Sequence, residues 1–406
     1  MPEYKDRKLP FSSHPDWPAV LYIVKTLQDM GFEALLAGGA VRDALMGMTP
    51  GDLDVATKAE PDQVEKLFPN TVAVGKAFGV IRVIALGKSI EVATYRLDQN
   101  YKDGRRPEAV VFTSREEDAK RRDFTINALY YDIIHNVLYD DVGGLIDLEN
   151  KTLKAVGDAS KRFQEDELRR LRLIRFVSQL GYEIEPQTWR EVQSGIEGLQ
   201  KISRERITEE TAKMWKSPHL RKAFKLWLEC KMGEQVEGFW KNRTISDFPE
   251  VVWLWSRKNL EEAWAHYFSF YWQKQSSWEQ ALENFKISKD LQNKLKKASE
   301  IFQLGLKFLD LSWGEKRVLW VESLGPWALH AAFSLVGQEA QLKDWTLKLQ
   351  EAGPLPDPLL RGQDLLSILQ GPRLGEVLRM AFLEQLNQNW TKKEQAIQWL
   401  KANNKI

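Results

Sequence analysis

The stretch Leu35–Asp43 (LLAGGAVRD), followed by Gly51–Val55 (GDLDV), decides how the first part of this 406-residue chain folds. The apolar run predicts a short buried strand, and the glycine pair predicts a turn that opens a helix. Successive side chains of a strand point to opposite faces, so Asp52 and Asp54 share one face while their apolar neighbours point into a core. The sequence therefore predicts two carboxylates in one small volume.

Two converging carboxylates repel each other, and a divalent cation relieves that repulsion. Mg²⁺ prefers a few carboxylate oxygens together with substrate phosphates. We therefore expect a Mg²⁺ site at Asp52 and Asp54, which indicates phosphoryl or nucleotidyl transfer. Glu91 lies opposite its apolar neighbours in a predicted strand, so it is a candidate third metal ligand; an exposed strand glutamate is the alternative.

The glycine turn is also a candidate phosphate cradle. Unpaired backbone N–H groups at a helix start face outward, and Gly38 and Gly39 allow a ligand to approach them closely. A tight strand-to-helix turn is the simpler explanation of the two glycines. Arg42 favours the cradle, because a cation in the first turn opposes the helix dipole and suits a bound triphosphate.

Composition sets outer limits on the protein. A chain of 406 residues predicts two to four folded units. Lys plus Arg number 58 and Asp plus Glu number 57, so any surface for nucleic acid must be a local patch. Cys230 is the only cysteine, which excludes an internal disulfide and predicts a reducing compartment. No stretch is long and apolar enough to span a bilayer, so we expect a cytoplasmic protein without a membrane partner.

The chain changes character along its length. Alternating apolar patterns up to about residue 140 predict a small mixed sheet with helices, including a strand and a hairpin over 71–96 and a mobile loop over 98–107. From residue 159 onward helical periodicity dominates, and most of the sixteen tryptophans lie there, where we expect them to pack in cores. A proline-rich break at 352–358 predicts a linker before a final helical hairpin. The predicted fold class is α+β.

One apparent motif carries no function, and one motif of a related class of enzymes is absent. Gly87-Lys88-Ser89 resembles the end of a P-loop, but it lies in a predicted hairpin rather than between a strand and a helix. None of the five histidines is followed by aspartate, so the His-Asp dyad of metal phosphohydrolases is missing.

The segment Glu116–Ala128 (EEDAKRRDFTINA) completes a recognisable set. Together with the glycine turn and Asp-Leu-Asp, it resembles the head domain of class II CCA-adding tRNA nucleotidyltransferases and the related bacterial poly(A) polymerases. Three further segments follow in the family's order and resemble its hinge (143–148), its nucleotide-reading motif (165–169) and its neck-closing motif, Glu205-Arg206-Ile207 with Glu209. Segments 362–365 and 371–378 are similar to the tail of many bacterial members.

The resemblance implies a division into four parts. These are a nucleotidyltransferase head at 1–142, a helical neck that recognises the base at 143–215, a helical body at 216–350 and a helical, tRNA-binding tail at 351–406. It also implies which residues act. Asp52 and Asp54 would hold the metal ions, and the nucleotide would be bound by Gly38, Gly39, Arg42, Arg122, Asp123, Asn127, Asp166, Arg169, Arg172 and Arg175.

The pair Asp166 and Arg169 suits base reading on independent grounds. Cytosine and adenine both present an amino donor beside a ring-nitrogen acceptor, whereas uracil and guanine present a carbonyl beside a ring N–H. Asp166 accepts only and Arg169 donates only, and residues three apart on one helix are neighbours. An ordinary ion pair between them is the structural alternative.

The implied activity is transfer of CMP and AMP from CTP and ATP to the 3′ end of tRNA, held by its acceptor arm. Members that add only CC have a shortened loop, whereas loop 98–107 looks full length, with Asp103, Arg105 and Arg106 available for the switch from C to A. Members that add only the terminal A keep this loop, so A-only addition is also compatible with the sequence. Segment 75–79 (GKAFG) is unlike the Gly-Arg-Arg-Phe stretch of poly(A) polymerases. A non-catalytic tRNA-binding protein is the alternative from another class, and the oligomeric state stays open.

Overall fold

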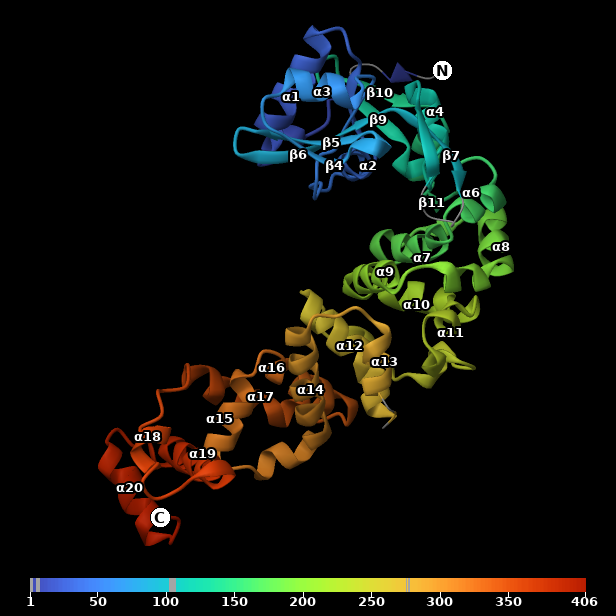
Figure 1. Cartoon of the computed structure of the whole chain (residues 1–406). Coiled ribbons are helices and arrows are strands. Elements are labelled where there is room, and N and C mark those ends of the chain that lie inside the picture. The colour runs from blue at the N-terminus through green and yellow to red at the C-terminus, as the bar shows by residue number, and fades with distance from the viewer. Residues whose placement is uncertain (1–2, 5–7, 102–106, 275, 277) are drawn as a thin grey trace. The chain divides into compact units, whose positions relative to one another are not determined.

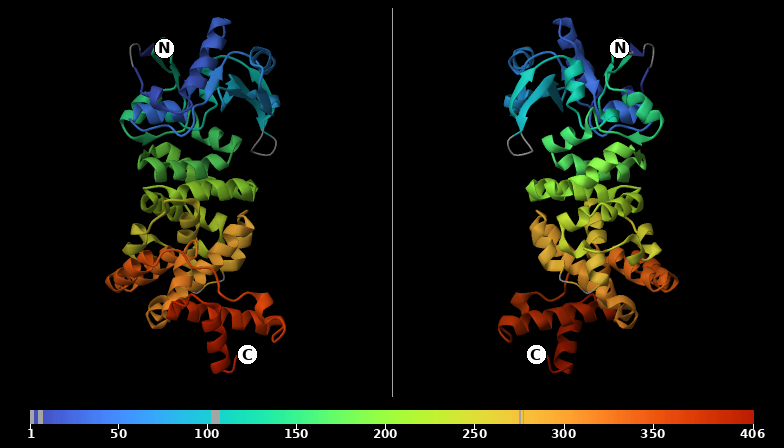
Figure 2. Two further views of the ribbon diagram at one scale, coloured as in Figure 1. Left: turned by 90° about the vertical axis from the view of Figure 1, so that its left-hand side faces the viewer. Right: turned by 90° about the vertical axis from the view of Figure 1, so that its right-hand side faces the viewer.

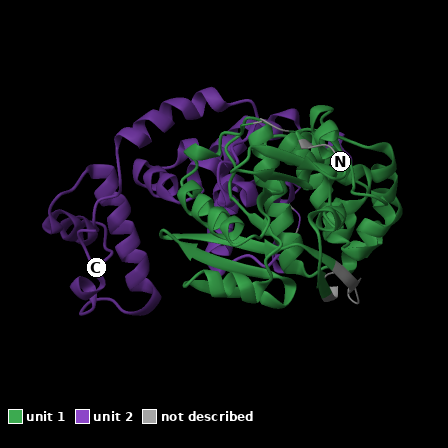
Figure 3. Cartoon of the chain, turned by 90° about the horizontal axis from the view of Figure 1, so that it is seen from above, with its two compact units in different colours: residues 1–243 green, residues 244–406 purple. Residues whose placement is uncertain are grey.

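The computed structural model describes residues 3–4, 8–101, 107–274, 276 and 278–406. The chain divides into two compact units, residues 1–243 and residues 244–406 (Figure 3). The first unit combines a sheet with helices and the second is helical, so the predicted α+β class is confirmed (Figure 1). The finer division at residues 142, 215 and 350 stays a prediction.

Unit 1 is built on a mixed eight-stranded sheet in the order β1-β10-β9-β2-β3-β6-β5-β4. Neighbouring strands run antiparallel except β3 and β6, which are parallel. The strands of this sheet are β1 Glu3–Tyr4, β2 Ala34–Ala37, β3 Val55–Thr57, β4 Thr71–Gly75, β5 Val80–Ala85, β6 Lys88–Thr94, β9 Leu129–Asp132 and β10 Val137–Asp140.

Helices α1 (Trp17–Asp29) and α3 (Pro61–Leu67) cover one face of this sheet. The buried side chains of α1 recur at steps of three and four residues, which places them on one side of the helix: Ala19, Val20, Ile23, Val24 and Leu27. Helix α2 (Gly39–Leu45) follows β2 directly, as the glycine turn predicts. The opposite face of β3 and β6 is left open to a cavity.

The predicted hairpin over 80–95 is confirmed, and its turn explains the false P-loop. Strands β5 and β6 pair from Val80 with Ala93 to Ala85 with Lys88. The two turn residues between them, Leu86 and Gly87, both have positive φ, at 50° and 73°. This conformation is that of a tight hairpin turn rather than a phosphate-binding loop.

The prediction of a loop over 98–107 is wrong at both of its ends. Strand β7 (Arg96–Tyr101) pairs with β8 (Pro107–Phe112) in an antiparallel ladder that matches Arg96 with Phe112. The composition of this segment indicates only that its polar residues form strands poorly. The pairing of β7 with β8 outweighs that weak propensity. Residues 102–106, with Asp103, Arg105 and Arg106, lie outside the described residues.

The rest of unit 1 is mostly helical. A small departure from prediction is a parallel pair of two-residue strands, β11 Thr152–Leu153 and β12 Glu183–Ile184. The helices are α4 Arg115–Lys120, α5 Gly144–Glu149, α6 Ala159–Glu165, α7 Leu168–Leu180, α8 Pro186–Ser194, α9 Arg204–Lys216, α10 Leu220–Glu229 and α11 Met232–Val236.

Unit 2 is helical, from yellow to red in Figure 2. Its helices are α12 Leu260–Gln273, α13 Trp278–Asn284, α14 Lys289–Leu304, α15 Trp313–Val321, α16 Gly325–Leu335, α17 Glu339–Glu351, α18 Gly362–Leu365, α19 Gly371–Gln388 and α20 Lys393–Ala402. The predicted break separates α17 from α18. None of the helices described in either unit has the length and apolar character needed to cross a membrane.

The tryptophans pack as predicted. Trp215, Trp227 and Trp240 of unit 1 are fully buried against one another, with ring centroids 5.1–6.2 Å apart. In unit 2, Trp272 is fully buried and Trp255 packs edge-on against Trp327. These rings supply apolar area to cores and are not available as stacking platforms for bases.

Candidate active site

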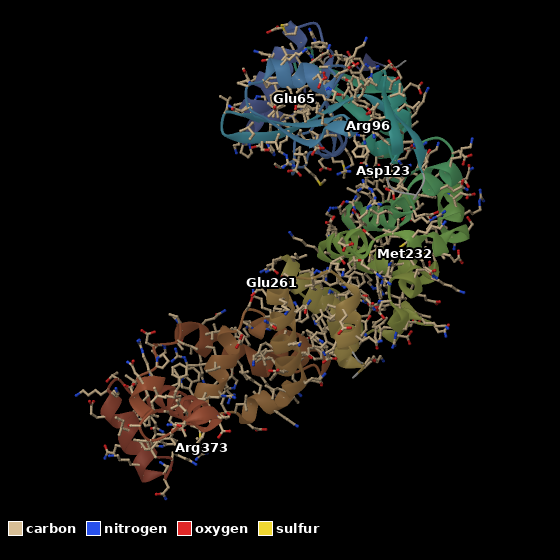
Figure 4. The ribbon with its side chains drawn as sticks, in the orientation of Figure 1. Glu65, Arg96, Asp123, Met232, Glu261 and Arg373 are labelled. Atoms are coloured by element: carbon tan, nitrogen blue, oxygen red, sulfur yellow. The ribbon has the colours of Figure 1, made fainter. Side chains whose placement is uncertain are left out.

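A cavity of about 730 Å³ in unit 1 brings the predicted site residues together. It lies between the open face of the sheet and helices α7 and α9, where Asp123 is labelled in Figure 4. Every predicted site residue lines it: Gly38, Gly39, Arg42, Asp52, Asp54, Glu91, Arg122, Asp123, Asn127, Asp166, Arg169, Arg172 and Arg175. Segments more than a hundred residues apart in sequence thus meet in one place.

The glycine turn requires glycine at its first position. Gly38 has φ 73° and ψ −130°, which L side chains rarely adopt. A Cβ there would come within 2.9 Å of Arg122 Nη1. Gly39 then begins α2, whose first N–H groups have no helical acceptor. The turn is therefore structurally constrained and still offers free donors to the cavity.

The two aspartates differ slightly from prediction. Both precede β3, which begins only at Val55, although the Ala37 N–H donates to the Asp54 carbonyl at 3.1 Å and holds the chain extended. The predicted alternation holds, since Leu53 and Val55 are buried while Asp52 and Asp54 are exposed. On the side of β2 the ladder ends near Asp54, because β2 turns into α2 at Gly38.

Without a bound cation, the surroundings of Asp54 disfavour the ionised form of its carboxyl group. Although part of the Asp54 side chain faces the open cavity, the loss of hydration on its protein side raises its pKa to about 6, and the nearby carboxylates Glu91 and Asp52 raise it further than Arg122 lowers it. The parallel register of β3 and β6 pairs Val55 with Val92, which sets Glu91 beside Asp54. A group in such surroundings gains from a bound cation.

The donor set fits a divalent ion that completes its shell with substrate. Within the described residues no group of three or more His, Cys, Asp or Glu side chains forms a closed metal site. Mg²⁺ characteristically binds one or two carboxylates and takes its other ligands from phosphates and water. Asp52 and Asp54 supply such a pair, with Glu91 next to them.

Arg42 belongs to a hydrogen-bonded chain that crosses the cavity wall. Its Nη1 donates to Asn127 Oδ1 at 2.5 Å, and its Nη2 lies 2.6 Å from Asp43 Oδ1. Asn127 Nδ2 in turn donates to Asp123 Oδ1 at 3.0 Å, and Arg172 donates to Asp123 Oδ2 through Nε and Nη2 at 2.9 and 2.6 Å. Burial alone would raise the pKa of Asp123, but Arg172 and Asn127 hold it well below its usual range.

Arg122 is held by a residue that the sequence analysis did not single out. Asp118, 1% exposed, accepts from Arg122 Nε and Nη2 at 3.3 and 3.2 Å, from Arg121, and from the Tyr130 hydroxyl at 2.6 Å. The guanidinium also lies 4.9 Å from the centre of the Tyr130 ring. The available signal was the spacing, since Asp118 stands four positions before Arg122, which lies just beyond the end of α4.

The predicted placement of Asp166 on the neck helix is wrong. Helix α6 ends at Glu165 and α7 begins at Leu168, so Asp166 lies in the break, with φ −147°. Its carboxylate accepts from Arg206 Nη1 and Nη2 at 3.1 and 2.6 Å. Arg169 instead donates to Glu165 and to the Arg162 carbonyl. The alternative of a simple Asp166–Arg169 ion pair is therefore also wrong, and both side chains line the cavity with separate supports.

Helix α9 supplies the remaining support. Glu210 is 4% exposed and lies 2.6 Å from Arg175 Nε and 3.6 Å from Arg172 Nη1. Glu209, which the motif suggested, is exposed. The signal that was missed is helical spacing, since Arg206, Glu210 and Lys213 share one face of α9. Arg170 pairs with Glu167 away from the cavity, so the arginines of α7 do not act as one cluster.

The similarities to known proteins follow this geometry. The family model described as the poly A polymerase head domain matches residues 34–154, which contain the glycine turn, the carboxylates and the segment around Arg122. A second model, described as the probable RNA and SrmB-binding site of polymerase A, matches residues 181–237. The chain also superposes on the Bacillus stearothermophilus CCA-adding enzyme in complex with CTP, with a TM-score of 0.74, 28% identity and coverage of 96% of this chain and 98% of that one. The chain is therefore similar, in its head domain and along its fold, to the class II CCA-adding enzymes and poly(A) polymerases.

Curated proteins similar to the chain include CCA-adding enzymes. Those of Lactobacillus helveticus and Bacillus pumilus are 42% and 43% identical over 231 and 243 residues. These alignments cover 56% and 60% of this chain and only 58% and 60% of the two relatives. The Thermotoga maritima CCA-adding enzyme complexed with tRNA is 18% identical, with a TM-score of 0.63 and coverage of 99% of each chain, and shares the fold.

Proposed function

We propose that this protein is a CCA-adding tRNA nucleotidyltransferase, which transfers CMP and AMP from CTP and ATP to the 3′ end of tRNA and releases pyrophosphate. The observation that carries the proposal is one cavity lined by a helix N-terminus, a carboxylate pair and the two candidate base-reading residues Asp166 and Arg169. The similarity to CCA-adding enzymes over 231 and 243 residues supports it.

The triphosphate binds where the cavity offers donors. The free N–H groups at Gly39 and the Arg42 guanidinium face it, and both favour anions. Asp52 and Asp54, with Glu91 beside them, would hold two Mg²⁺ ions. When bound, these ions lower the pKa of the attacking 3′-hydroxyl and stabilise the leaving oxygens. The protein positions the α-phosphorus between carboxylates on one side and cations on the other.

Base selection rests on the break between α6 and α7. The Asp166 carboxylate has acceptor sites left beside its bonds to Arg206 and takes the amino hydrogen of cytosine or adenine. Arg169 donates to the adjacent ring nitrogen. Uracil or guanine would place an acceptor against Asp166, which costs on the order of 1–3 kcal/mol for an unsatisfied buried group. Arg122 and Asp123 hold the sugar side of the nucleotide.

The tRNA acceptor arm is the proposed partner, and cytoplasmic location accords with the single buried thiol of Cys230. The second candidate function is A-only addition, because strands β7 and β8 keep a complete hairpin base. Poly(A) synthesis and plain tRNA binding are the further alternatives. Scattered Lys and Arg on the helices suffice for phosphate contacts to an acceptor arm.

One experiment separates these activities. The protein is incubated with tRNAs that end at the discriminator base, at C or at CC, with CTP and ATP supplied separately and together, and the products are sequenced. CCA addition extends all three tRNAs to CCA. Extension of only the CC-ending tRNA indicates an A-adding enzyme, and long A tails indicate a poly(A) polymerase. Absence of incorporation overturns the proposal in favour of a binding protein.

The variant Asp166→Ala tests the base-reading role. We expect the ratio of kcat/KM for CTP over UTP to fall about 10- to 100-fold, in line with one lost discriminating contact. Glu205→Ala, at an exposed position of the same motif, is the control and leaves the ratio within about twofold. An unchanged ratio in Asp166→Ala contradicts the role.

A further inference from the structure

A row of side chains leads from the carboxylates to the edge of the sheet. The β3–β6 register sets Glu91 beside Asp54, the β5–β6 register pairs Glu91 with Arg82, and the β4–β5 register pairs Arg82 with Val72. Directly paired residues project from the same face of a sheet. At about 4.8 Å per strand, the row extends about 14 Å from Asp54 to Val72. It therefore continues the cavity face out to the last strand.

Arg82 differs from the arginines on the opposite side of the cavity. It is exposed and, within the described residues, its guanidinium group has no hydrogen bond or ion pair. By contrast, the guanidinium groups of Arg42, Arg172 and Arg206 are each held by an aspartate. A cation without a protein partner beside a reaction centre keeps its full capacity for an anionic ligand.

Apolar side chains flank Arg82 on the same face. Val72 is its cross-strand neighbour and is 46% exposed; Ile84 lies two residues along β5 and is 43% exposed. Single exposed apolar residues are ordinary. Two of them beside a free cation offer an apolar surface for a base or ribose next to a donor for a phosphate, which matches the end of a single-stranded nucleic acid.

The direction of the reaction selects this side of the sheet. In phosphoryl transfer the attacking and leaving oxygens lie roughly in line on opposite sides of the phosphorus. The proposed triphosphate site, at the start of α2, follows β2 on one side of β3. Strands β6, β5 and β4 lie on the other side of β3. An attacking hydroxyl opposite the pyrophosphate therefore approaches across these three strands.

We propose that the face formed by Val72, Arg82, Ile84 and Glu91 binds the unpaired 3′-terminal nucleotides of the RNA substrate. Arg82 donates to a backbone phosphate, and Val72 and Ile84 contact the adjoining sugar or base. Glu91 lies between them and the reacting 3′-hydroxyl. This inference rests on the proposed function, and it assigns the RNA end to a surface apart from the nucleotide-binding arginines.

The test compares charge reversals on the two faces of the sheet. Arg82→Glu alters the proposed RNA track, and Lys25→Glu makes the same change in charge at an exposed position of α1, which covers the opposite face. Incorporation of CMP into a tRNA ending at the discriminator base is measured over a range of salt. We expect Arg82→Glu to raise KM for tRNA about tenfold and to reduce the salt slope by about one, with KM for CTP within twofold of wild type.

Further variants and outcomes complete the test. Ile84→Ser removes apolar contact without a change in charge, and we expect a smaller rise in KM for tRNA and an unchanged salt slope. If Arg82→Glu acts no more strongly than Lys25→Glu, or raises KM for CTP instead, the inference is overturned while the proposed function stands. If the wild-type protein incorporates no nucleotide, the proposed function fails and the inference with it.

Discussion

Asp52 and Asp54 line the same cavity as Arg169, Arg172 and Arg175 of α7, yet the charges of the two groups are neutralised differently. The aspartates have no cationic partner in hydrogen-bonding contact among the described residues, and the pKa of Asp54 is raised to about 6. Arg169 and Arg172 are paired with Glu165 and Asp123. The carboxylates thus depend on a cation from outside, whereas the arginines are positioned before any ligand arrives.

This difference has a physical logic. A carboxylate that must coordinate a metal loses ligand capacity if a protein cation occupies it. An arginine has five donors in a rigid fork, so it can bind a supporting acid and still donate to a ligand. Substitutions on the two sides should therefore act differently, through loss of the external cation on one side and through misplaced donors on the other.

Asp54→Ala removes the charge that attracts the external cation. We expect incorporation of CMP to fall by at least about 10³-fold, because charge stabilisation at the reaction centre is lost. Binding of tRNA in a filter assay stays within about twofold. Asp29→Ala, an exposed acid at the end of α1, is the control. An Asp54→Ala protein with near wild-type turnover would remove the basis for the metal site.

Glu210→Gln loosens the arginine side while keeping nearly the same shape. Glu210 supports Arg175 and Arg172 from α9, so we expect kcat/KM for CTP to fall about 10- to 100-fold through misplaced donors. Glu209→Gln changes the adjacent, exposed position and serves as the matched control. Equal losses in the two variants, measured at saturating tRNA, contradict the positioning role.

Asp54→Asn tests the unpaired charge through stability. The pKa of Asp54 is about 6 in the folded protein against 3.8 for an unperturbed aspartate, so the folded state binds the extra proton between these values and stability falls as pH rises through that window. Asparagine removes this loss. In EDTA, we expect the melting temperature of Asp54→Asn minus that of wild type to increase from pH 4 to pH 6 and then to level off.

The change in melting temperature on addition of a divalent cation provides a second test of Asp54. Added Mg²⁺ raises the melting temperature of the wild-type protein at pH 7.5, since a ligand of the native state stabilises it, and raises that of Asp54→Asn less. If the difference in melting temperature between the two proteins does not change with pH, or if both respond equally to Mg²⁺, then Asp54 is not a carboxylate with a raised pKa.

Local pattern was enough for much of the fold. The turn at Gly38, the alternation around Leu53 and the hairpin over 80–95 each depend on residues a few positions apart, where backbone geometry acts directly. The loop prediction over 98–107 failed because composition does not report which strand offers a ladder partner. The order of the motifs, in turn, indicated the family before any contact was known.

Patterns in the sequence thus indicated the class of fold, most strands of the sheet and many of the residues that line the cavity, but not the support given by Asp118 and Glu210. How the charges pair depends instead on the packing of separate segments. Asp123 and Arg172 are 49 residues apart and Asp166 and Arg206 are 40 apart, whereas neighbours such as Asp166 and Arg169 do not pair. Ion pairs of this kind depend on directions and distances of a few ångströms between separately folded segments, and these are set by packing rather than by spacing along the chain.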